Sequence, residues 1–170
     1  MTDHVHDLAC AIAHGDVPAP VEDRRLVAVF DSPVARELAH FAAHVGFSVV
    51  VLDPAGASEG VFETVTSAAS AALDGRTDVV VTDHDRPELG DVLADVLRAQ
   101  PRWIGVIGSP RHTAPHIALL RDRGFDDADI ARVHRPIGLN IGSRSPAEIA
   151  ISTVAGLLAD RNGRTGGTYS

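Results

Sequence analysis

The chain has 170 residues, of which 45% are apolar and only 4% aromatic, and its formal net charge is −8. This acidic balance argues against binding to nucleic-acid backbones, which requires a surplus of basic side chains. All fifteen basic residues are arginines, which excludes chemistry that depends on a Schiff-base lysine or a P-loop lysine. A single cysteine, Cys10, excludes an internal disulfide framework and a cysteine-rich metal site.

Residues 1–23 form a preamble and linker, in which a short helix is predicted from His6 to His14. This segment has no basic region followed by an apolar stretch, and no apolar run in the chain approaches the roughly 20 residues that a membrane span needs. We therefore expect a soluble cytoplasmic protein without membrane association. One domain is expected over residues 24–160, followed by a flexible, Gly- and Thr-rich tail over residues 161–170.

Apolar runs and helix-like stretches alternate from residue 26 onwards. Strands are predicted at residues 26–30, 48–53, 78–82, 103–107 and 137–141. Helices are predicted at residues 33–45, 61–73, 87–99, 112–123, 126–132 and 145–160. Uniformly apolar strands that alternate with helices are typical of a parallel sheet buried on both sides. The sequence thus predicts an α/β fold, doubly wound and Rossmann-like, with a mostly parallel five-stranded sheet and helices on both faces.

Two of these helices have clear signals at their first residues. Asp31 or Ser32 is the expected N-cap of the first helix, with Pro33 in its first turn. Ser145 and Glu148 form a predicted capping box at the start of the last helix.

Ligands of doubly wound sheets bind beyond the carboxyl ends of the strands, where the strand order reverses. The candidate site is therefore built from the loops at residues 30–34, 53–57, 82–87, 107–112 and 141–145. The candidate cofactor-binding residues are Asp31, Ser32, Asp53, His84, Gly108, Ser109, Arg111 and Gly142. No catalytic residue is assigned.

Several of these positions have two interpretations. The segment Gly108–Arg111 is either an anion site ahead of a helix or a strand-to-helix turn with a serine cap. The loop from Gly142 to Ser145 offers a second helix start with a nearby arginine, although its capping box favours a structural role. Asp83, His84 and Asp85 could transfer protons near neutral pH, but a hydrogen-bonded acidic turn is favoured.

Two histidine pairs have the four-residue spacing that can bind a metal on one helix face. They are His40 with His44 and His112 with His116. The first pair lies with Arg36 and Glu37 opposite the apolar face of its helix, so surface histidines are favoured and no metal site is predicted.

Three segments in the second half of the chain resemble those of a known family. They are the strand and acidic turn at residues 78–85, the strand ending in Gly-Ser at residues 103–109, and the stretch from Pro136 to Ala150. Together they resemble the C-terminal, Rossmann-type domain of the xanthine dehydrogenase accessory factor (XdhC/CoxI) family. The resemblance implies a homodimer that handles molybdenum cofactor for a molybdenum hydroxylase. The ligand itself is not identified, and a molybdopterin-type nucleotide is the candidate.

The first strand and its loop depart from the family. The family pattern resembles Gly-x-Gly-x-x-Ala, whereas residues 30–35 read Phe-Asp-Ser-Pro-Val-Ala. Phe30 and Ser32 place side chains where a pyrophosphate would approach, and Asp31 adds a negative charge. Asp53 alone stands where an acid would hold a ribose hydroxyl. Residues 1–23 also lack the motif of the family's usual N-terminal domain.

Two hypotheses follow for the function. In the first, the chain is a non-enzymatic module that assists cofactor handling by binding a partner protein or a nucleotide. In the second, it is a small NAD(P)-dependent oxidoreductase that tolerates a degenerate glycine loop. The side chains of Phe30, Asp31 and Ser32 favour the first hypothesis and predict that NAD and NADP do not bind.

Overall fold

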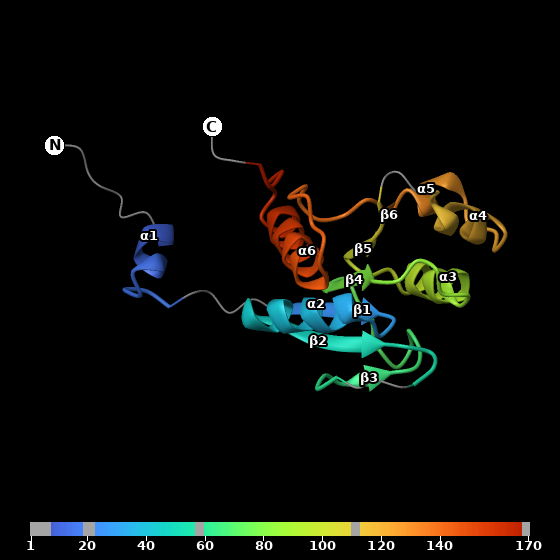
Figure 1. Cartoon of the computed structure of the whole chain (residues 1–170), viewed down its shortest axis with the longest axis horizontal. Coiled ribbons are helices and arrows are strands. Elements are labelled where there is room, and N and C mark those ends of the chain that lie inside the picture. The colour runs from blue at the N-terminus through green and yellow to red at the C-terminus, as the bar shows by residue number, and fades with distance from the viewer. Residues whose placement is uncertain (1–7, 19–22, 57–59, 110–112, 168–170) are drawn as a thin grey trace.

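A computed structural model describes residues 8–18, 23–56, 60–109 and 113–167 (Figure 1). Its strands are β1 (Arg24–Val29), β2 (Phe47–Leu52), β3 (Thr64–Val65), β4 (Thr77–Val81), β5 (Trp103–Val106) and β6 (Val133–His134). Its helices are α1 (Leu8–Ala13), α2 (Pro33–His44), α3 (Leu89–Ala99), α4 (Pro115–Arg121), α5 (Asp127–Ile130) and α6 (Pro146–Arg161). None of the helices in these ranges is long and apolar enough to cross a membrane.

The six strands form one parallel sheet in the order β3-β2-β1-β4-β5-β6. The predicted Rossmann-like fold is therefore confirmed, although the sheet has one strand more than predicted. Successive residues of β1 point to opposite faces, so that Leu26 and Ala28 contact α2 and α6 while Val27 and Val29 contact the α3 side. Both faces of the sheet are thus covered (Figure 1).

The prediction of a helix at residues 61–73 is wrong. This segment contains the two-residue strand β3 followed by turns. Strand β3 extends the sheet because the backbone amide of Asp53 donates to the carbonyl of Val65. Downstream, the hydroxyl of Ser67 accepts a hydrogen bond from the backbone amide of Ser70, and its carbonyl accepts one from the amide of Ala71. This single turn ends at Ala72, whose φ of +48° lies in the left-handed region that a helix cannot continue through.

The prediction of a strand at residues 137–141 is also wrong, since the last strand, β6, ends at His134. Gly138 and Gly142 both have positive φ angles, +83° and +70°, which extended strands do not contain. The backbone amide of Leu139 donates to the carbonyl of Ser152 in α6, so this loop is held by a helix and not by the sheet.

Both predicted helix caps are confirmed. The hydroxyl of Ser32 accepts a hydrogen bond of 3.0 Å from the backbone amide of Ala35 at the start of α2. At the start of α6, Ser145 and Glu148 form the full capping box, in which each side chain accepts from the other residue's backbone amide.

A buried ion cluster ties the sheet to the end of α6. The carboxylate of Asp78 in β4 is fully buried and pairs with the guanidinium groups of Arg102 and Arg161. Arg102 also reaches Asp160, at 2.7 Å. These contacts lie near the amino ends of β4 and β5, whereas the predicted ligand site lies at the carboxyl ends of the strands.

Candidate functional site

The carboxyl ends of β1, β2 and β4 meet where the strand order reverses, because the chain leaves β1 for β2 on one side and later returns to β4 on the other. Three of the predicted site residues, Asp31, Ser32 and Asp53, lie together there. The structure therefore brings together residues that are 22 positions apart in the sequence.

Phe30 follows β1 at the position of the family's first glycine. Its φ angle is +69°, in the left-handed region that glycine adopts readily and aromatic residues adopt rarely. Its ring is fully buried, and the guanidinium of Arg86 lies 4.8 Å from the ring centroid. The backbone turn of a glycine loop is thus retained, while an aromatic side chain fills the core beneath it.

The side chain of Ser32 is engaged in structural hydrogen bonds. Besides capping α2, its hydroxyl lies 2.8 Å from that of Thr82, which also donates to the carbonyl of Phe30. Asp31 pairs with Arg36 on the first turn of α2, at 3.0 Å. The loop after β1 is therefore held by its own side chains at the place where a pyrophosphate would bind.

Asp53, at the end of β2, is only 2% exposed. Its carboxylate accepts hydrogen bonds of 2.9 Å from the backbone amides of Asp31 and Ala55. It also pairs with Arg86 at 3.3 Å. The acid that was expected to hold a ribose hydroxyl thus joins the loops after β1, β2 and β4 to one another.

Arg86 is the functional candidate that sequence reasoning missed. It pairs with Glu88 as well as Asp53, and the hydrogen bond to Glu88 is the main cause that raises the pKa of Arg86. The same bond lowers the pKa of Glu88. One signal was available in the sequence, since Arg86 is the only basic side chain of the loop at residues 82–87.

A pocket of about 470 Å³ lies beside this cluster. It joins the loop after β4 to the first turns of α4, and its lining residues are His84, Asp85, Arg86, Pro87, Thr113, Pro115 and Leu119. Nε2 of His84 lies 3.7 Å from the Asp85 carboxylate. Of the predicted site residues, only His84 lines this pocket, and Arg86 supplies its positive charge.

The other predicted residues that the structure describes do not line this pocket. A Cβ atom at Gly108 would stand 2.5 Å from Nε of Arg135, so this glycine makes room for the arginine side chain. Gly142 is exposed and its positive φ serves a turn. Ser109 is partly exposed, and Arg111 lies outside the described residues.

The histidines of the two pairs differ in their exposure to solvent. His40 and His44 are exposed on α2, as predicted. His116 is only 3% exposed, so the prediction of a surface histidine is wrong there, because the short helix α4 turns this residue towards α5 and β6. His112 lies outside the described residues. Within those residues, no cluster of three or more His, Cys, Asp or Glu side chains is placed to hold a metal.

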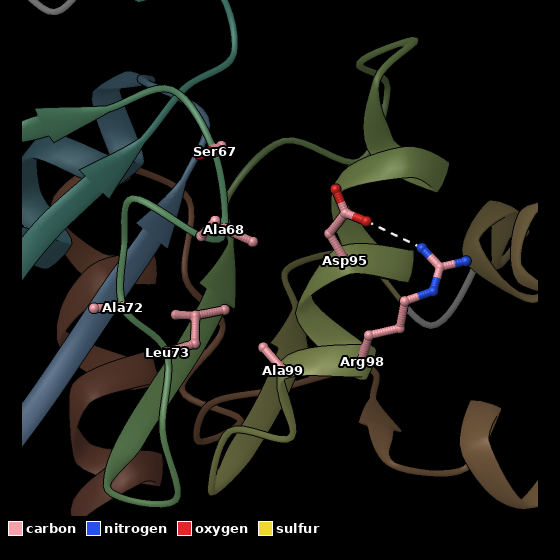
Figure 2. A pocket seen from close by; sticks show the side chains of 8 residues that line it. Ser67, Ala68, Ala72, Leu73, Asp95, Arg98 and Ala99 are labelled. Carbon is pink, nitrogen blue, oxygen red and sulfur yellow. Dashed lines mark hydrogen bonds and ion pairs between the residues drawn. The ribbon is translucent and has the colours of Figure 1, made fainter.

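A second pocket of similar size, about 490 Å³, lies between the turns that replace the predicted helix and the end of α3 (Figure 2). Figure 2 shows Ala68, Ala72 and Leu73 on one side and the ion pair of Asp95 and Arg98 on α3. The segments that contain these residues lead into β4 and β5, so the pocket lies towards the amino ends of these two strands. Its small side chains offer little chemistry beyond that ion pair.

The comparisons with known proteins agree with this geometry. The sequence family described as the XdhC Rossmann domain matches residues 26–157. The uncharacterized protein YqeB of Escherichia coli K12 is 35% identical over 158 residues, which make up 84% of this chain and 28% of that protein. The molybdenum cofactor insertion chaperone PaoD of Escherichia coli K12 is 26% identical over 106 residues, 62% of this chain and 33% of that protein.

A crystal structure from Bacillus halodurans, described as a xanthine dehydrogenase, aligns with a TM-score of 0.66 and 27% identity. The alignment covers 84% of this chain and 44% of that one. The chain thus spans a third or less of the length of its two curated relatives. Matching sequence over residues 26–157 and a Rossmann-like sheet lead to one conclusion: the chain belongs to the XdhC Rossmann domain family.

Proposed function

We propose that this chain is an accessory module that assists the handling of molybdenum cofactor for a molybdenum hydroxylase, by binding a nucleotide or a partner protein and not by catalysis. Its membership of the XdhC Rossmann domain family and its similarity to PaoD, a molybdenum cofactor insertion chaperone, support this proposal. The observation that carries the non-enzymatic part is the ion pair between Asp53 and Arg86.

That ion pair occupies the acid that an NAD-dependent enzyme would use. A ribose hydroxyl would have to replace hydrogen bonds that Asp53 already makes to Arg86 and to two backbone amides. A pyrophosphate would meet the carboxylate of Asp31 close to the Ser32 cap. The alternative of a small NAD(P)-dependent oxidoreductase is therefore less well supported.

The pocket that contains His84 and Arg86 is the site that we propose for the nucleotide. A molybdopterin-type nucleotide carries phosphate groups, and Arg86, which also pairs with Asp53 and Glu88 at 3.3 and 3.2 Å, is the arginine that lines this pocket. His84 lines the same pocket, and its ring nitrogens can form hydrogen bonds to a ligand. Gly108, Ser109 and Gly142, on the loops that follow β5 and precede α6, remain predicted contacts. Arg111, which lies outside the described residues, remains a predicted contact as well.

Calorimetric titration with NAD, NADP and molybdopterin cytosine dinucleotide tests this proposal. We expect binding of the last ligand in the micromolar range and no binding of NAD or NADP below the millimolar range. The variant His84→Asn should weaken the binding of molybdopterin cytosine dinucleotide, whereas the exposed control His44→Asn should leave it unchanged. A micromolar dissociation constant for NAD or NADP would overturn the proposal.

We further propose that the protein functions as a homodimer. Large apolar side chains remain exposed on the single chain, among them Ile141 at 55% and Ile151 at 49%. Light scattering at tens of micromolar protein should report twice the mass of the chain. A monomer at that concentration would contradict this part of the proposal without affecting the titration result.

A further inference from the structure

A third pocket, of about 350 Å³, lies on the far side of α4 from the proposed nucleotide site. It is bordered by α4, the end of α5, β6 and the residues after β6, and its lining residues are Ala114, His116, Ile117, Ile130, Ala131, Val133, Arg135 and Pro136. Pro115 and Leu119, four residues apart on one side of α4, face the nucleotide pocket, while His116 and Ile117 face this one. The two pockets are therefore separate.

His116 is the polar group of this pocket that the structure leaves unexplained. The side chain is buried, with 3% of the residue exposed, and its Nδ1 atom has no hydrogen-bond partner among the described residues. Buried polar atoms of proteins are paired in the great majority of cases. An unpaired one in the wall of a pocket is a group that a ligand can satisfy.

Arg135 brings a positive charge to the same pocket. Its Nη1 atom donates a hydrogen bond of 2.9 Å to the carbonyl of Thr113, and its guanidinium packs against Gly108 at the end of β5. These contacts fix the position of the charge beside His116. Among the lining residues, only Arg135 and His116 are charged or titratable, and the others are apolar or small.

We propose that this pocket binds a small oxyanion, a carboxylate or a sulfate-like group, between the guanidinium of Arg135 and Nδ1 of His116. The guanidinium is suited to planar and tetrahedral oxyanions because it presents several donors in a fixed plane. The apolar side chains of Ile117, Ile130 and Val133 are suited to a short hydrocarbon attached to the oxyanion. The inference does not depend on the proposed function, because it concerns another pocket and another ligand.

The charge state of His116 makes the binding sensitive to pH. Burial lowers the pKa of His116 below its ordinary value, and the nearby charge of Arg135 adds to this effect. A bound anion acts in the opposite direction, since it favours the imidazolium form. The anion should therefore bind more tightly as the pH falls, with Nδ1 of His116 as a donor.

The experiment is a titration of the full chain with sodium sulfate, acetate and butyrate, followed through the imidazole signals of His116 by nuclear magnetic resonance. Sulfate keeps its charge across the range from pH 5.5 to 8, so a change in affinity reports on the protein. We expect sulfate to raise the pKa of His116 by about one unit, which corresponds to about a tenfold gain in affinity between high and low pH. Tighter binding of butyrate than of acetate would identify the hydrocarbon-bearing carboxylate as the preferred form.

Two variants and one control separate binding from folding. His116→Phe keeps an apolar ring in place and should reduce the affinity for sulfate at least tenfold. His116→Asn keeps a polar group near Nδ1, and should retain binding while losing its dependence on pH. The exposed control His44→Asn should behave like the unmodified chain. The proposal is overturned if the His116 signals do not move with any of the three anions, or if a folded His116→Phe variant binds as tightly as the unmodified chain.

Discussion

The guanidinium of Arg86 lies 4.8 Å from the centroid of the Phe30 ring while its Nη2 atom reaches the Asp53 carboxylate at 3.3 Å. One side chain thus stacks on the loop after β1 and forms an ion pair with the loop after β2. A nucleotide entering the usual position between these loops would have to displace both contacts. This arrangement is the physical basis for expecting a Rossmann domain of this sequence to take its ligand elsewhere.

The first prediction concerns the strained aromatic residue. Phe30→Gly should lower the free energy of unfolding by about 1–4 kcal/mol, because the loss of a buried ring costs about 3–5 kcal/mol and relief of the left-handed conformation returns about 1–2 kcal/mol. Urea unfolding measures the change. Gln100→Gly is the matched control, since this exposed residue has a φ of +53° at the end of α3. This variant should have a free energy of unfolding up to about 1 kcal/mol higher than that of the unmodified chain. Equal losses in the two variants would contradict the interpretation.

The second prediction tests whether restored glycines are enough for NAD. The double change Phe30→Gly with Ser32→Gly should raise the affinity for NAD only modestly, because the carboxylate of Asp31 and the pair of Asp53 with Arg86 remain. Calorimetry on the folded variant gives the answer. Tight binding of NAD by the double variant would show that the Asp31 carboxylate and the pair of Asp53 with Arg86 do not prevent NAD binding.

The buried carboxylate of Asp78 carries the third prediction. Asp78→Asn should lower the free energy of unfolding by about 3–5 kcal/mol, because it removes the buried negative charge that balances the guanidinium groups of Arg102 and Arg161. Denaturant melts would measure this loss. Asp95→Asn, which breaks an exposed ion pair with Arg98, should change stability by less than about 1 kcal/mol. A similar small effect at Asp78 would show that the cluster contributes little.

The fourth prediction concerns the start of α6. Ser145→Ala should cost about 1 kcal/mol, the usual loss for an N-cap. It should leave ligand binding nearly unchanged, because the hydroxyl is engaged with the backbone amide of Glu148. The same variant is to be examined by a denaturant melt and by the nucleotide titration. Intact stability together with lost binding would mean that the serine contacts the ligand.

The fifth prediction concerns the contribution of Asp74 to stability at low pH. A hydrogen bond from Arg76 holds the pKa of the partly exposed Asp74 at about 2, below its ordinary value of 3.8. Because the folded state has the lower pKa, the stabilisation is present above pH 4 and is lost as the pH falls towards 2. The difference in unfolding midpoint between the unmodified chain and Asp74→Asn should therefore shrink over this range. A constant difference would exclude the carboxylate as its source.

The central elements could be predicted from the sequence because their signals are local. The apolar runs of β1, β2 and β4 and the capping box at Ser145 depend on neighbouring residues only. Strand β3 is too short for any periodicity. It forms because the backbone amides of Val51 and Asp53 donate to the carbonyls of Glu63 and Val65. Such long-range pairing leaves no trace in a window of a few residues.

The candidate site shows the same division. The loops at the carboxyl edge, and the role of Ser32 as a helix cap, followed from residue type and position. The ion pair between Asp53 and Arg86 and the burial of His116 both depend on side chains that are distant in the sequence. Only the folded chain shows whether a polar group is already paired.

Both edges of the sheet are formed by strands of two residues, β3 and β6. Pro136, two residues beyond β6, has no backbone N–H to offer. Edges this short present too few unpaired main-chain groups to template another strand, so addition of a neighbouring chain to the sheet is disfavoured. If copies associate as proposed, the contact would therefore use side chains on helices and loops, whose shape and charge can distinguish one partner from another.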